Sequence, residues 1–310
     1  MPIPTDVGDL VERVRSGDRR ALARAISVAE DRRAGADDLL AASYTGSGGP
    51  IVVGITGAPG AGKSSLVSEL ITRVRALGQT IAVLAIDPSS PFTGGAILGD
   101  RIRMQEHVSD AGVFIRSMST RGHLGGLSDA TSRALVVLGA AGFDVIVVET
   151  VGVGQSETEI AEAADTTIVV VTPGWGDGIQ AAKAGLLEIA DLFVINKADL
   201  GGAEEVERDL ALMLDLGQDT GWRPRIVRSS AVEQRGISEI WDEVGRHREW
   251  LVVDHRGVDR RMAQLEILIR RAARAELMSR LERLDLPEGL TGRVASGELD
   301  PWSAARSLIS

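Results

Sequence analysis

Seven short runs rich in Val and Ile alternate with helical stretches through the middle of the chain. The runs cover residues 51–56, 80–86, 112–115, 144–149, 166–172, 192–196 and 225–228. Most are apolar without interruption, as strands are when both faces of their sheet are covered. The helical stretches between them favour repeated βαβ units. We therefore predict an α/β fold with a mostly parallel, doubly wound sheet.

Helical periodicity also marks both ends of the chain. Residues 6–44 carry apolar positions spaced by three and four, and a loop rich in Gly and Ser follows at 43–50. Another apolar stripe runs from residue 258 to residue 284, and Asp300-Pro301 marks the start of a last short helix. These patterns divide the chain into an N-terminal helical segment at 1–49, an α/β domain at 50–254 and a C-terminal helical arm at 255–310.

Composition narrows the class of protein. The chain has 310 residues, 44% hydrophobic and 25% charged, and no cysteine. These values exclude a wholly disordered chain, a disulfide scaffold and a cysteine nucleophile. The net charge of −10 argues against nucleic-acid binding, which needs a basic surface. Because no apolar run reaches the roughly 18 residues of a membrane span and no signal sequence is evident, we expect a cytoplasmic protein.

One stretch fits the G-x-x-x-x-G-K-[ST] pattern of a phosphate-binding loop in full. A predicted strand precedes it and a predicted helix follows, as the motif requires. Glycines let successive N–H groups turn toward phosphate oxygens, and the positive end of the helix adds to the attraction. A Gly-rich turn without a ligand is the simpler alternative. The candidate residues are Gly57, Ala58, Pro59, Gly60, Ala61, Gly62, Lys63, Ser64 and Ser65.

A second motif, Asn196-Lys197-Ala198-Asp199, lies at the end of the sixth predicted strand. This N-K-x-D pattern is typical of guanine recognition. The carboxylate of Asp199 can accept hydrogen bonds from both the ring N–H and the exocyclic amine of guanine. Adenine offers neither donor there, so a carboxylate without a partner would oppose ATP. We therefore predict GTP as the ligand.

Acidic residues at strand ends and in the loops that follow are candidates for a magnesium site. Glu149 ends the fourth run, Asp87 directly follows the second at the end of the predicted strand, and Asp100 lies in a Gly-rich loop. A carboxylate near phosphates commonly holds Mg²⁺ through water, and the hydroxyl of Ser64 would ligate it directly. Gly152 would donate its N–H to the γ-phosphate. Loop solvation or helix capping is the alternative role for Asp87 and Asp100.

Two further sets of residues carry weaker signals. The loop after the last strand could back the guanine through main-chain N–H groups, with Ser230, Ala231 and Val232 as candidates. The four histidines have no ligand spacing, so we interpret them as solvated or packed. Residues 254–257 do not match the D-x-H-x-x-G loop that ligates cobalamin, so no directly bound cobalamin is predicted.

Together these motifs resemble the MeaB/ArgK/MMAA family of P-loop GTPases, the chaperones of adenosylcobalamin-dependent methylmalonyl-CoA mutase. The resemblance covers nearly the whole chain. It rests on the strings at 54–65, 87–101, 121–126, 149–157 and 196–199, which are far more specific than a phosphate loop alone.

The resemblance implies properties that composition does not show. The family forms homodimers through the C-terminal arm, binds the mutase, gates cobalamin loading by GTP hydrolysis and protects the mutase from inactivation. By motif, Lys63 and Ser64 bind phosphate and Mg²⁺, while Asp87, Asp100 and Glu149 match the metal-site acids. The loop at 173–183, which contains Gln180 and Lys183, resembles a switch that responds to the client. We take Lys63, Asp100, Glu149, Gln180 and Lys183 as the candidate catalytic residues.

The expected mechanism is nucleotide gating with slow intrinsic hydrolysis. No Gln follows Gly152 directly, since Gln155 stands three residues on, and Arg121 is a candidate arginine finger. Catalysis of phosphoryl transfer depends on positioning and charge neutralisation, so a partner that orders these loops would speed the reaction.

Several other functions are possible for a chain with a phosphate-binding loop, and sequence features argue for or against each. A nickel or zinc metallochaperone would need Cys or clustered His, which the chain lacks. An ATPase or kinase of a basic amino-acid transport system is opposed by the guanine motif. A membrane-bound positioning ATPase would carry Lys where this chain has Ala58, although the Arg-rich stretch 260–283 could lie on anionic lipid. A chaperone of a different cobalamin-dependent acyl-CoA mutase and a non-catalytic interaction module are the remaining alternatives.

Overall fold

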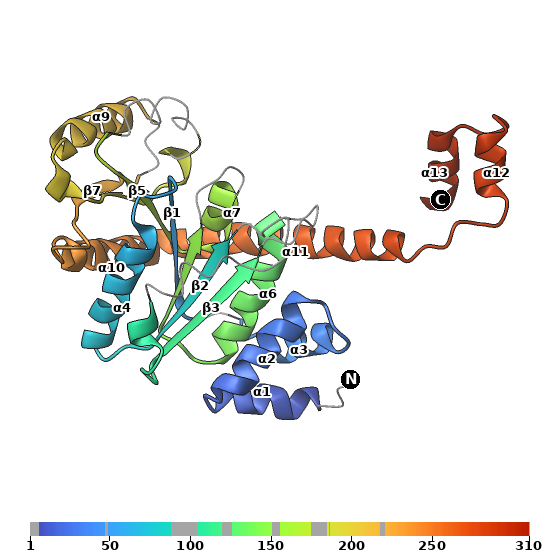
Figure 1. Ribbon diagram of the computed structural model, residues 1–310, viewed down its shortest axis with the longest axis horizontal. Coiled ribbons are helices and arrows are strands. Elements are labelled where there is room, and N and C mark those ends of the chain that lie inside the picture. Colours follow the sequence, from blue (N-terminus) through green and yellow to red (C-terminus); the bar gives the residue numbers. More distant parts are fainter. Residues whose placement is uncertain are drawn as a thin grey trace. The chain divides into compact units, whose positions relative to one another are not determined.

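The computed structural model describes residues 6–46, 49–87, 104–119, 126–150, 156–174, 185, 187–217 and 221–309. The chain divides into two compact units, Met1–Leu268 and Ile269–Ser310. The first unit contains the sheet with its covering helices, and the second contains the end of a long helix and two short ones (Figure 1).

Seven strands form one sheet in the order β3-β2-β4-β1-β5-β6-β7, and every neighbouring pair is parallel. This order confirms the predicted parallel, doubly wound sheet. The chain fills one side of β1 before it crosses to the other, so the strand order reverses beside β1. In open α/β sheets, ligands bind at the carboxyl ends of the strands next to such a reversal. The strands are β1 (Ile51–Gly57), β2 (Ile81–Asp87), β3 (Val113–Ser119), β4 (Val145–Thr150), β5 (Thr166–Val171), β6 (Leu192–Ile195) and β7 (Arg225–Arg228).

One strand is longer than its sequence pattern indicates. The apolar run ends at Ile115, but β3 continues to Ser119. Arg116 interrupts the run, and its guanidinium donates to Ser27 and Glu30, both at 3.0 Å. The partners of Arg116 lie about ninety residues away in sequence, so a local pattern misses this half of the strand.

Helices cover both faces of the sheet, because successive strand side chains point to opposite sides. On one face, α4 (Lys63–Ala76) and α10 (Ile237–Val252) share a core with residues such as Val83 and Val194. On the other face, α6 (Gly126–Ala140) and α7 (Ser156–Ala163) cover residues such as Leu84, and α9 (Ala203–Leu216) covers Phe193. The 3-10 turns are η1 (Gln105–His107), η2 (Ala198–Leu200) and η3 (Val253–His255).

The three N-terminal helices belong to the same core as α6 (Figure 1). They are α1 (Val7–Arg15), α2 (Arg19–Glu30) and α3 (Ala36–Ser43), as the spacing of apolar residues predicts. Asp18 caps α2, because its carboxylate accepts from the backbone N–H groups of Arg20 and Ala21 at 2.9 and 3.0 Å.

The predicted C-terminal helices are also present. They are α11 (Arg256–Glu282), α12 (Leu290–Ala295) and α13 (Pro301–Ile309). Asp300 caps α13 by accepting from the N–H groups of Trp302 and Ser303, both at 3.0 Å. Within the described residues, none of the helices combines the length and the apolar character that crossing a bilayer requires.

Candidate nucleotide-binding site

The turn between β1 and α4 requires glycine at both of its ends. Gly57 has a φ of 139°, and a Cβ there would lie 2.0 Å from the carbonyl oxygen of Val170 on β5. Gly62 has a φ of 85°, and a Cβ there would lie 2.4 Å from Nδ2 of Asn196. Both backbone conformations are open to glycine and strained for other residues. The sequence motif therefore encodes a loop packed tightly against two neighbouring strands.

Lys63 opens α4 and folds back over the loop. Its Nζ donates to the carbonyl oxygens of Gly57 at 2.8 Å and Ala58 at 3.0 Å, and the side chain is buried. Neutral carbonyls fix the position of the ammonium without cancelling its charge. The arrangement keeps a cation at the positive end of α4, where anions are favoured.

Ser64 and Glu149 meet at the carboxyl ends of the central strands. The Ser64 hydroxyl donates to Oε1 of Glu149 at 2.6 Å, and both side chains are buried. Glu149 pairs with Ile55 of β1 and Ala85 of β2, which fixes its height in the sheet. Two side-chain oxygens from motifs 85 residues apart are thus within hydrogen-bond distance of each other.

Two buried threonine hydroxyls next to this site form a hydrogen bond that no sequence motif predicts. Thr150 donates through Oγ1 to Oγ1 of Thr56 at 3.0 Å, which ties the end of β4 to the end of β1. Threonine is common in strands, so the residue type alone gave no signal. The bond holds Glu149 and the phosphate loop in a fixed relation.

The remaining predicted residues near the phosphates fall into two groups. The backbone of Asp87 ends β2, next to β4, on the edge that carries Glu149. Asp100, Arg121, Gly152, Gln155, Gln180 and Lys183 lie outside the described residues.

The two predicted motifs are in direct contact. Asn196 is buried at the end of β6, and its Nδ2 donates to the carbonyl oxygen of Ala61 at 2.9 Å. Lys197 has a left-handed φ of 57°, and its Nζ donates to the carbonyl oxygen of Gly60 at 2.8 Å. The N-K-x-D motif thus holds the phosphate loop as well as presenting Asp199.

The loop after β7 packs on the same motif. Oδ1 of Asn196 accepts from the Ser229 hydroxyl at 3.3 Å and from the backbone N–H of Ala231 at 3.4 Å. Asp199 is exposed, and a hydrogen bond from the Ser230 side chain is the main cause that lowers the pKa of its carboxyl. The predicted residues Ser230 and Ala231 therefore lie beside the guanine motif.

Val232 is highly exposed, so among the three loop residues it has the least structural support for a contact with guanine. The loop closes through an antiparallel bridge between Ser230 and Arg235, whose backbone groups exchange two hydrogen bonds of 3.1 Å. Val232 lies at the tip of this closed turn.

Comparisons with known proteins agree with the geometry. The model of the family described as methylmalonyl Co-A mutase-associated GTPase MeaB matches residues 22–284. A Pyrococcus abyssi protein whose name describes it as a GTPase is 47% identical over 310 residues, covering 98% of this chain and 96% of its own. The Caenorhabditis elegans methylmalonic aciduria type A homolog, mitochondrial, is 33% identical, with coverage of 98% and 82%.

A solved structure extends the likeness to three dimensions. The crystal structure of a LAO/AO transport system kinase matches with a TM-score of 0.74 and 29% identity, covering 99% of this chain and 98% of that chain. Its match over the full length agrees with the parallel sheet and with the phosphate loop after β1. The chain is a P-loop GTPase and belongs to the MeaB family.

Proposed function

We propose that this GTPase is a nucleotide-gated chaperone of methylmalonyl-CoA mutase or of a related cobalamin-dependent acyl-CoA mutase. The description of its family and the name of the nematode relative support a client in methylmalonyl metabolism. The observation that carries the nucleotide part is the hydrogen bond from Asn196 to Ala61, because it joins the guanine motif to the phosphate loop.

The roles of the nucleotide-binding residues follow from their positions. The Lys63 ammonium and the backbone N–H groups of 57–65, except at Pro59, which has none, bind the β- and γ-phosphates. Asp199 accepts two hydrogen bonds from guanine, and the hydrogen bond from Ser230 lowers the pKa of its carboxyl, which favours the ionised form. The loop at 230–232 backs the base.

The residues around Ser64 fit a magnesium ion. Mg²⁺ takes oxygen ligands and keeps several waters, so one hydroxyl and one or two carboxylates suffice. Ser64 and Glu149 supply such oxygens 2.6 Å apart, and Asp87 ends the adjacent strand. In the part of the chain that the structure describes, no cluster of three acidic or histidine side chains offers a self-sufficient metal cage. When bound, the ion would neutralise phosphate charge.

We propose that the response of hydrolysis to the mutase depends on loops outside the described residues. We propose that Asp100, Gly152, Gln180 and Lys183 act in these loops and that Arg121 supplies charge to the transferred phosphate. Ordering of the loops by the mutase would complete the catalytic arrangement and speed a slow intrinsic reaction. Cobalamin is not a ligand of this chain in the proposal.

We also propose a homodimer built through α11 and the helices that follow it. Large apolar side chains along this arm are exposed in the single chain, and contiguous exposed apolar surface commonly marks an interface. They include Val258, Met262, Ile269, Leu277, Leu281 and Leu284.

The test is GTP hydrolysis by the full chain, with and without the methylmalonyl-CoA mutase of the source organism. We expect a slow GTP-specific rate that the mutase raises about tenfold or more, since partner-ordered GTPase sites gain at least this much. The K63A variant serves as the inactive control. A rate that is equal with and without the mutase would contradict the choice of client.

The main rival is an ATPase or kinase of a transport system, as the name of the solved relative suggests for that protein. Hydrolysis of ATP in preference to GTP in the same assay would favour it. A purely non-catalytic role would be indicated if K63A protected the mutase as well as the wild-type chain does.

A further inference from the structure

The strand β7 forms one edge of the sheet. Among the described residues, no strand pairs with its outer side. Ser229 directs both backbone groups inward, because its N–H donates to Ile195 at 2.8 Å and its carbonyl accepts from Ala198 at 3.0 Å. In a parallel strand this direction alternates, so Ile226 presents its N–H and C=O away from β6. The edge therefore offers backbone groups to another chain.

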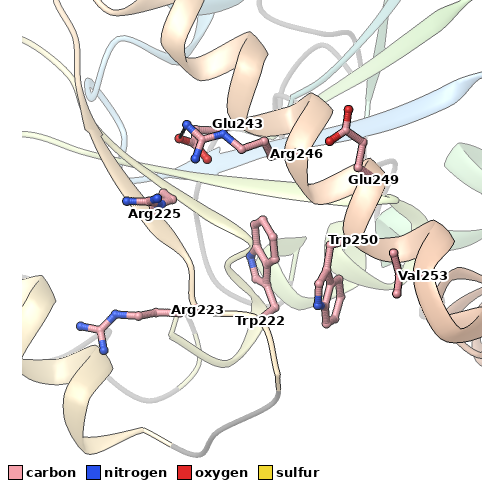
Figure 2. A pocket seen from close by; sticks show the side chains of 8 residues that line it. All are labelled: Trp222, Arg223, Arg225, Glu243, Arg246, Glu249, Trp250 and Val253. Atoms are coloured by element: carbon pink, nitrogen blue, oxygen red, sulfur yellow. Dashed lines mark ion pairs between the residues drawn. The ribbon is translucent and has the colours of Figure 1, made fainter.

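A hollow lies on each side of this edge. One has a volume of about 400 Å³, faces α10 and is lined by the residues drawn in Figure 2: Trp222, Arg223, Arg225, Glu243, Arg246, Glu249, Trp250 and Val253. The other has a volume of about 440 Å³ and faces α9, with Leu214, Pro224 and Ile226 in its lining. Both share Arg223 and Arg225.

Their arrangement on two sides of one strand suits a particular kind of ligand. Side chains of an extended peptide alternate between the two faces of the sheet that it joins. A peptide paired with β7 would place successive side chains in opposite hollows. Strand addition of this kind draws affinity from main-chain hydrogen bonds and specificity from such pockets.

The hollow beside α10 has a rigid aromatic floor. The rings of Trp222 and Trp250 lie 5.4 Å apart, and His247 stacks on Trp250 at 5.6 Å. Nε1 of Trp222 donates to the carbonyl oxygen of Asp191 at 2.8 Å, which fixes the indole. The chain has only five tryptophans, and two of them line this one hollow. Tryptophan and arginine are the residues that most often carry binding energy at interfaces.

Charge at the edge favours an acidic partner. Arg225 is exposed, and its side chain forms neither a hydrogen bond nor an ion pair with the residues that the structure describes, while its backbone belongs to the β6–β7 ladder. Arg223 pairs with Asp215 at 2.6 Å, but both side chains are more than half exposed, so this bond exchanges partners at little cost. Arg246 is held by the buried Glu243 at 2.7 Å, and Glu249 is the remaining acid of this hollow. In the other hollow, Glu207 accepts a hydrogen bond from Arg228 at 2.6 Å. Arg223 and Arg225 thus give this sheet edge two positive charges, although the chain as a whole has a net charge of −10.

We propose that the outer edge of β7 binds an extended acidic segment of the client mutase by strand addition. An acidic side chain of that segment meets Arg223 and Arg225, and an apolar side chain packs on Trp222 and Trp250. The identity of the partner rests on the proposed function. The chemistry of the surface rests on the geometry of β7 and its two hollows.

The test compares mutase binding by the full-length wild-type chain and by the R225E variant. We expect R225E to weaken binding about tenfold or more and to remove most of its dependence on salt, because a cation at the interface is replaced by an anion. The R225K variant should keep most of the affinity. R20E is the matched control, since Arg20 is also exposed and lies on α2.

Two further readouts separate a local effect from loss of the fold. GTP hydrolysis without the mutase should be equal in all four proteins. Hydrogen exchange at the Ile226 N–H should slow when the mutase binds the wild-type chain, as strand pairing requires.

The outcomes distinguish this inference from the proposed function. If the mutase binds R225E as tightly as the wild type, the β7 edge is not the docking surface, while the proposed function stands. If the mutase fails to bind the wild type in any nucleotide state, the proposed function is wrong and the inference falls with it. If R225E instead changes the oligomeric state of the chain, a second copy occupies the edge and the mutase assignment is overturned.

Discussion

At the scale of single residues, the proposed recognition of guanine depends on the charge of the Asp199 carboxylate. The hydrogen bond from Ser230 is the main cause that lowers the pKa of Asp199, with smaller contributions from its own backbone, Arg235 and Lys197. A lowered pKa means that the carboxylate stays charged at neutral pH and loses its charge only on strong acidification. The side chain is therefore an acceptor for two hydrogen bonds throughout the range in which cells work.

We expect the D199N variant to prefer a xanthine nucleotide to a guanine nucleotide. The amide has an NH2 group in place of one of the two acceptor oxygens of the carboxylate, so guanine loses one hydrogen bond and its own N–H meets another N–H. We expect GTP affinity to fall about a hundredfold, and affinity for xanthosine triphosphate, which has an oxygen in that place, to rise. Fluorescence titration with both nucleotides checks this. Equal loss of both would show that Asp199 serves only to hold the loop.

At the scale of elements, the strands were predictable and the contacts between loops were not. Most strands match a continuous apolar run, although β3 extends past Arg116 and β7 has only two apolar residues, Ile226 and Val227. The phosphate loop follows from the fixed spacing of its motif. The hydrogen bond from Asn196 to Ala61 joins positions 135 residues apart, so no local pattern encodes it. The threonine pair at the ends of β1 and β4 is invisible for the same reason.

The G62A variant tests the junction of the two motifs. A methyl group would meet Nδ2 of Asn196 at 2.4 Å, at a backbone conformation that alanine adopts only under strain. We expect a loss of about 1–3 kcal/mol in the free energy of unfolding together with loss of GTP binding. Urea denaturation and nucleotide titration measure the two effects. The G60A variant is the control, because nothing lies within 4 Å of the added Cβ although φ is also positive.

At the scale of the whole molecule, a buried cluster joins the start of β6 to α10 and α11. Asp191 binds Arg260 through two hydrogen bonds of 2.8 and 3.0 Å, and Nε2 of His247 lies 3.3 Å from the same carboxylate. Nδ1 of His247 is 2.9 Å from the hydroxyl of Thr166. The sequence supported only the interpretation that the histidines are solvated or packed. The residues of this cluster, Thr166, Asp191, His247 and Arg260, are far apart in the sequence and form no motif.

The cluster predicts a dependence of stability on pH. Burial is the main cause that lowers the pKa of His247, and Asp191 opposes it. The unfolded chain therefore binds a proton more readily, so stability is lost as pH falls through the unfolded value of about 6.5. We expect the H247Q variant to lose less free energy of unfolding than the wild type between about pH 7.5 and about pH 5.5. Parallel changes in urea unfolding at the two pH values would contradict this assignment.

The packing of α2 against α6 has a consequence for the synthesis of the protein. Ala25 and Ile26 of α2 are fully buried, and Arg32 pairs with Asp129 of α6 at 2.8 Å. The ribosome releases α6 about a hundred residues after α2, so the first helices leave the exit tunnel with their apolar face uncovered. The first helices can pack in their native core only after β4 and α6 have both been synthesised. We therefore expect the apolar face of the first helices to stay exposed to solvent until α6 has been synthesised.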